Sequence, residues 1–80
     1  PLDPVDTARY VAHRLTVAGA AADVRFDDDA CRIVHQRSGG IPRLINKLSD
    51  RAMLAAFVRG QRIVAGEDAQ RAATELERVL

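Results

Sequence analysis

The residues with the clearest potential for chemistry lie in the segment 38–46, Ser-Gly-Gly-Ile-Pro-Arg-Leu-Ile-Asn. Its two adjacent glycines permit a tight turn, and Pro42 suits the first position of the helix that follows. Arg43 then lies in the first turn of that helix, where the helix dipole disfavours a cation but free N–H groups bind anions. Because a guanidinium binds oxyanions through paired hydrogen bonds, we expect Arg43 to face an anionic partner outside this domain, and a phosphate fits best.

Ordinary structural roles are the alternative for the polar residues around this segment. Arg43 could instead form a surface ion pair with Asp50 or Asp29. Asn46 is expected to hold the Gly-Gly turn through hydrogen bonds to the backbone. The acidic run 27–29 begins a helix, where carboxylates cap free N–H groups, so capping is favoured over metal binding.

The cysteine and the histidines predict no metal or catalytic site. Cys31 and His35 are four residues apart, but two ligands do not make a zinc site. Cys31 is expected to be a small, partly buried apolar filler, and His13 a surface or boundary residue. The other arginines are expected to be mostly solvated, with some of them at a subunit interface: Arg51, Arg59, Arg62, Arg71 and Arg78.

The first half of the chain is predicted to form two helices that position this segment. One is expected at about residues 4–18, with Asp3 as its N-cap, because apolar residues recur there at helical spacing. The other is expected at about residues 28–37, with Asp27 as its cap, and it stops at the two glycines. Residues 20–26 connect the two helices.

The second half is predicted to form two further helices, one from Pro42 to Gly60 and one that opens at Gly66 after the extended residues 63–64. The first of these is apolar on more than one face, which is typical of a central, buried helix. The residues that widen its apolar face are Met53, Leu54, Phe57 and Val58. The inward face of the last helix is predicted to comprise Ala69, Ala72, Ala73, Leu76 and Leu80.

No segment alternates apolar and polar residues for a full strand, so we expect no sheet. The predicted fold class is all-α, a compact four-helix bundle. The length of 80 residues allows one small domain, and the single cysteine excludes an internal disulfide. No apolar run approaches a membrane span, and there is no signal-peptide pattern. The formal net charge of +1 disfavours a dedicated nucleic-acid module.

The motif and its surroundings resemble a known family. Gly40-Ile41-Pro42-Arg43 resembles the sensor-2 motif of AAA+ ATPases, which begins a helix of the C-terminal lid subdomain. The segments 1–3, 10–15 and 18–19 look like the first lid helix of ATPases of the general secretion pathway protein A type, and 38–48 with 50–52 look like their sensor-2 helix. The matches extend over about residues 1–76. Two positions differ from the usual pattern of that family. Ser49 stands where the family often has Cys, and Ala65-Gly66 stand where it often has a Thr, Ser or Asp that caps the last helix.

This resemblance implies a division of labour with a P-loop domain upstream in a longer parent chain, so that residues 1–80 are a single lid subdomain. The sequence has no G-x-x-x-x-G-K-[ST] motif and is not expected to hydrolyse ATP alone. In the parent, ATP and Mg²⁺ would be the cofactors, Arg43 would contact the γ-phosphate as the catalytic residue, and Gly40, Ile41 and Pro42 would lie near the adenine and ribose. The resemblance also implies a homo-oligomeric parent, partners in secretion or envelope machinery, and a cytoplasmic location, with association of the parent at the inner membrane as a further option.

Two other functions stay open from the sequence alone. The second and third helices with the Gly-Gly turn also resemble a helix-turn-helix, in which Arg43, Asn46 and Lys47 would read DNA. Against this, Leu44, Ile45 and Leu48 lie on a face that looks directed to the core. A partner-docking helical bundle is the other option, and it would need an exposed apolar patch.

Overall fold

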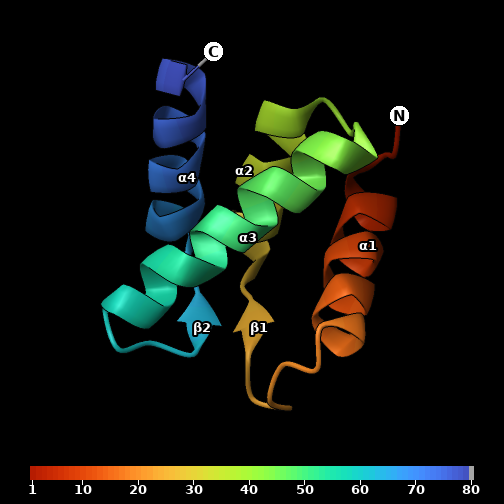
Figure 1. Cartoon of the computed structure of the whole chain (residues 1–80). Helices are drawn as coiled ribbons and strands as arrows, with labels where there is room; N and C mark the ends of the chain where they lie inside the picture. Colours follow the sequence, from red (N-terminus) through yellow and green to blue (C-terminus); the bar gives the residue numbers. More distant parts are fainter. Residues whose placement is uncertain (80) are drawn as a thin grey trace.

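Four α-helices make up most of residues 1–79, the part of the chain that the computed structural model describes (Figure 1). They are α1 (Pro4–Val17), α2 (Asp28–Ser38), α3 (Pro42–Val58) and α4 (Gly66–Val79). The predicted all-α fold is confirmed, and the predicted helix starts agree with the structure. The prediction that Leu80 faces inward lies outside the described residues.

A short parallel strand pair corrects the prediction of no sheet. The strands β1 (Arg25–Phe26) and β2 (Ile63–Val64) pair in the register Arg25 with Ile63 and Phe26 with Val64. The Asp27 N–H donates to the Val64 carbonyl at 2.9 Å just beyond this register. Two residues are too few to show an alternating pattern, and the two partners are far apart in the sequence, so no local signal could reveal the pair.

Side-chain carboxylates accept hydrogen bonds from backbone N–H groups at the start of three helices, and two of these caps, Asp3 and Asp27, were predicted from the sequence. Asp3 Oδ1 accepts a hydrogen bond from the Asp6 N–H at 2.8 Å, and Asp27 Oδ1 accepts one from the Ala30 N–H at 2.7 Å. The carboxylate of Asp68 accepts one from the Ala65 N–H at 2.9 Å, at the start of α4. The start of α3 is different, because Ile41 provides no side-chain cap and no acidic residue lies in the first turn.

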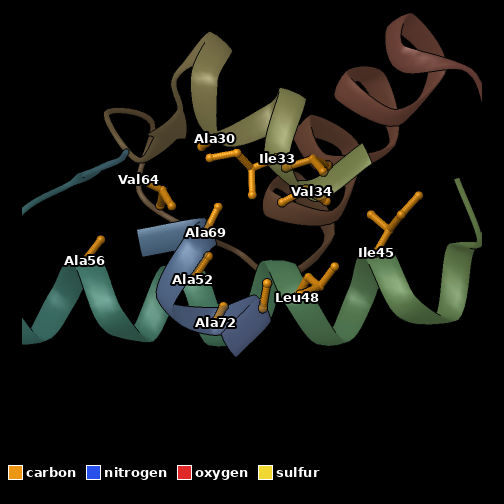
Figure 2. Packing of buried hydrophobic residues seen from close by; sticks show 12 residues of the cluster. Ala30, Ile33, Val34, Ile45, Leu48, Ala52, Ala56, Val64, Ala69 and Ala72 are labelled. Carbon is orange, nitrogen blue, oxygen red and sulfur yellow. The ribbon is translucent and has the colours of Figure 1, made fainter. Parts of the chain in front are cut away.

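Small side chains fill the core where α2, α3 and α4 meet. Figure 2 shows Ala52 and Leu48 of α3 on the side of this helix that faces α4 and α2. The buried alanines allow close approach between the backbones of these helices. The buried cluster consists of Val11, Ala30, Ile33, Val34, Ile45, Leu48, Ala52, Ala56, Val64, Ala69, Ala72 and Ala73.

The second half of α3 does not bury all of its apolar residues, which corrects the expectation of a helix buried on more than one face. Leu54 is 58% exposed, Phe57 50% and Val58 72%. Phe57 is partly covered, because it lines a pocket with Ala20 and Ala21 of the connection after α1. Only the inward stripe of this helix belongs to the core.

A buried carboxylate joins the end of α3 to the start of α4. Asp68 is only 2% exposed and accepts two hydrogen bonds from Arg59, at 2.9 Å from Nε and 2.7 Å from Nη2. The Arg59 hydrogen bond holds the pKa of the Asp68 carboxyl below its ordinary value, against the opposing effect of burial. Arg59 is exposed, as predicted, but its ion pair with Asp68 was not predicted from the sequence.

Replacing Asp68 tests this connection. Asp68→Asn is expected to lower the free energy of unfolding at pH 7 by about 1–3 kcal/mol, because it weakens the bonds to Arg59 and to the α4 cap. Since the pKa of Asp68 is lower in the folded than in the unfolded state, its stabilisation is complete well above pH 4 and is lost as the pH falls through the lowered value. Urea unfolding at pH 7 and at pH 3 measures both effects.

The matched control is Glu67→Gln, which alters the exposed carboxylate that lies 3.3 Å from Arg59. We expect it to change stability by no more than about 0.5 kcal/mol. Equal losses for the two variants, or the same dependence on pH in Asp68→Asn as in the parent sequence, would contradict the role assigned to Asp68.

Candidate functional site

The turn between α2 and α3 has the tight geometry that its glycines predict. Gly39 has φ of 62° and Gly40 has φ of 75°, both in the left-handed region. Ser38 Oγ accepts a hydrogen bond from the Gly40 N–H at 3.1 Å, and the Ile41 N–H donates to the Ser38 carbonyl at 3.2 Å. Ser38 thus fixes the turn that leads into the first residues of α3.

Asn46 does not hold this turn, contrary to the prediction. Its Oδ1 is buried and has no hydrogen-bond partner within the described residues. Ser38 performs the expected function from the other side of the glycines, because a serine at a helix end readily bonds to nearby backbone groups. That local tendency is the signal in the sequence that could have identified Ser38.

The N-terminal segment, residues 1–3, lies directly against Gly40. The Leu2 N–H donates to the Gly40 carbonyl at 2.8 Å. A Cβ at position 40 would lie 2.1 Å from the Leu2 carbonyl oxygen and 2.8 Å from the Leu2 nitrogen, so only glycine permits this approach. Gly40 is therefore buried, whereas Ile41 and Pro42 are exposed beside it.

Arg43 is exposed in the first turn of α3 and forms no ion pair within residues 1–79. Neither surface pair considered for it is present, because Asp29 bonds to Arg32 at 2.6 Å and Asp50 forms no ion pair in the described structure. The helix end beside Arg43 has no capping side chain and no acidic residue. An unpaired guanidinium and an uncapped helix end thus lie together at one exposed place, where both favour an anion.

The surroundings of His13 and Cys31, the other candidate residues, indicate structural roles. His13 is exposed, and Cys31 is partly buried as predicted. Burial, and to a smaller extent the charges of Asp28 and Asp27, raise the pKa of the Cys31 thiol, which disfavours the reactive thiolate form. Within residues 1–79, no group of three or more His, Cys, Asp or Glu side chains is placed to hold a metal ion.

The faces of α3 bear on the helix-turn-helix alternative. Arg43 and Lys47 are exposed, but Ile45 and Leu48 are buried in the core. Asn46 is only partly exposed and its Oδ1 is buried, so it offers less of its amide to an outside partner than a base-reading residue would.

Among residues 1–79, no helix has both the length and the apolar character that a membrane span requires.

This chain is similar to a segment of a longer known protein. It is 45% identical over 76 residues to general secretion pathway protein A from Aeromonas hydrophila. The resemblance predicted from the sequence is confirmed. The match covers 95% of this chain but only 14% of the relative, so the chain corresponds to a small segment of that protein. No protein-family model matches the chain.

Alanine substitutions at the two glycines of the turn separate backbone strain from contact with Leu2. Both glycines have positive φ, and forcing an alanine there is expected to cost about 1–2 kcal/mol of stability. Only Gly40→Ala also collides with Leu2, since a Cβ at Gly39 meets nothing within 4 Å. We therefore expect Gly40→Ala to lower the free energy of unfolding clearly more than Gly39→Ala does. Urea titration of the two variants measures the difference, and equal losses would mean that Leu2 does not constrain the turn.

Proposed function

We propose that this chain is the lid subdomain of an AAA+ ATPase of the general secretion pathway, with Arg43 as its sensor-2 arginine. The observation that carries the proposal is the exposed, unpaired guanidinium of Arg43 at an α3 start that lacks any carboxylate. The similarity to general secretion pathway protein A over nearly the whole chain supports the choice of family.

In this proposal the ATP and its Mg²⁺ are held by a P-loop domain of the parent chain, and this chain supplies the residues that close over them. The guanidinium of Arg43 binds the γ-phosphate with paired hydrogen bonds and stabilises the negative charge that develops on it during hydrolysis. Ile41 and Pro42, which are exposed next to Arg43, form the surface beside the adenine and ribose. Gly40 contributes indirectly, because it is buried and shapes the turn.

The same arrangement links hydrolysis to motion. The turn residues are fixed to Ser38 and to Leu2, so Arg43 moves together with the body of the helical bundle. Loss of the γ-phosphate removes an interaction that only the closed state makes, which shifts the lid toward a different angle. The parent would work as a homo-oligomer in the cytoplasm, with partners in the secretion machinery.

The test is ATP turnover by the longer protein that carries this segment. Arg43→Ala is expected to lower kcat by about a hundredfold or more, because it removes a charge that stabilises the transition state. Arg43→Lys keeps the charge but loses the paired hydrogen bonds, so an intermediate loss is expected. Steady-state kinetics with ATP and Mg²⁺ measures all variants.

Lys47→Ala is the matched control, because Lys47 is an exposed cation one turn further along α3 and forms no ion pair within residues 1–79. It should retain normal turnover. The proposal fails if Arg43→Ala keeps normal turnover, or if the reading frame upstream of Pro1 encodes no P-loop.

A further inference from the structure

The Leu2 backbone forms one hydrogen bond to the α2–α3 connection and one to α2 itself. The Leu2 N–H donates to the Gly40 carbonyl at 2.8 Å. The Leu2 carbonyl accepts a hydrogen bond from Nε2 of His35 at 3.1 Å. The Leu2 side chain also packs against the buried core. The path of the N-terminal segment over the bundle is therefore fixed by one backbone bond, one side-chain bond and apolar packing.

Of these three contacts, only the hydrogen bond from His35 depends on the polar group of one side chain. This histidine lies on α2, is half-buried, and reaches across 33 residues of sequence to its acceptor. Because a carbonyl oxygen can only accept, the Nε2 atom must carry the hydrogen.

The anchored segment is continuous in space with the start of α3. Gly40, which Leu2 contacts, is followed by Ile41, whose carbonyl accepts hydrogen bonds from the N–H groups of Leu44 at 3.0 Å and Ile45 at 2.9 Å. These bonds form the helical turn that bears Arg43. A displacement of Leu2 therefore acts on the same short connection that places the guanidinium.

We propose that His35 is a positioning residue for Arg43: its hydrogen bond to Leu2 fixes the direction in which the chain enters the bundle relative to the start of α3. The inference rests on the proposed function, since it assigns to His35 an effect on the geometry with which Arg43 meets the nucleotide. In the proposed parent protein, the P-loop domain would connect to the bundle through this N-terminal segment, whose backbone Leu2 fixes. His35 touches neither the nucleotide nor the reacting atoms and acts only through Leu2 and Gly40.

The contact itself is tested without ATP, on residues 1–80. His35→Phe keeps a planar ring but removes the donor, whereas His35→Gln keeps an N–H donor. We expect His35→Phe to speed amide hydrogen exchange at Leu2 by roughly two- to tenfold, because it removes one hydrogen bond that holds this segment. Exchange in the middle of α3 and α4 should be unchanged. His35→Gln should restore slow exchange. If the phenylalanine variant does not fold, His35→Leu takes its place.

A double-variant comparison checks the route of the effect. Gly40→Ala displaces Leu2 by a steric clash and should speed Leu2 exchange on its own. Adding His35→Phe to Gly40→Ala should then change Leu2 exchange little further, because the anchored geometry is already lost. Fully independent effects, unchanged exchange in His35→Phe, or exchange in His35→Gln equal to that in His35→Phe would each overturn the proposed contact.

The positioning role is tested by ATP turnover in the longer protein. His35→Phe is expected to lower kcat roughly two- to tenfold while KM for ATP stays within about twofold, and His35→Gln is expected to restore kcat. Because a loss of folded protein also lowers turnover at constant KM, kcat is calculated per folded enzyme, and a purely structural role would leave this normalised kcat unchanged. Normal kcat in His35→Phe, together with a large loss in Arg43→Ala, would overturn the role of His35 alone. Normal turnover in Arg43→Ala would overturn the proposed function instead. The hydrogen-exchange data would still show whether His35 holds Leu2 in place.

Discussion

The Leu2 backbone lies so close to Gly40 that any side chain at position 40 would collide with the Leu2 carbonyl oxygen. This steric constraint explains why the turn before α3 needs a glycine with a left-handed backbone there. It also brings the N-terminal segment, the end of α2 and the start of α3 together at one place. The surroundings of Arg43 follow from this arrangement, because the guanidinium projects from the first turn that the connection begins.

The charges at the helix starts show how this place differs from the rest of the molecule. Asp3, Asp27 and Asp68 cap α1, α2 and α4 from within the chain, so the positive ends of these helices are already satisfied. The start of α3 has an arginine and no carboxylate. An anion bound there would supply what the other three helices obtain internally, which is the physical basis for the proposal that Arg43 binds a phosphate.

The core is small and consists largely of alanine and valine, so the helices approach closely but each buried residue contributes little apolar area. The bond network of Arg59 and Asp68 joins α3 to α4 at one end of the bundle, and the contacts of Leu2 join the N-terminal segment to the α2–α3 turn. Such polar connections matter more in a domain of this size than in a large one, because the hydrophobic contribution is limited.

The sequence by itself determined the features that depend on neighbours within a few residues. The caps Asp3 and Asp27, the glycine turn and the start of α3 at Pro42 all follow from local backbone chemistry, and so does the position of Arg43 in the first turn. The tertiary structure alone decided that β1 pairs with β2, that Arg59 binds Asp68, and that Leu54, Phe57 and Val58 are exposed. Most of these features depend on how distant segments pack, and neither side-chain periodicity nor spacing encodes which of several compatible partners a residue will meet. The bond from His35 to Leu2 is of the same kind, because it spans 33 residues and has no signature in either segment.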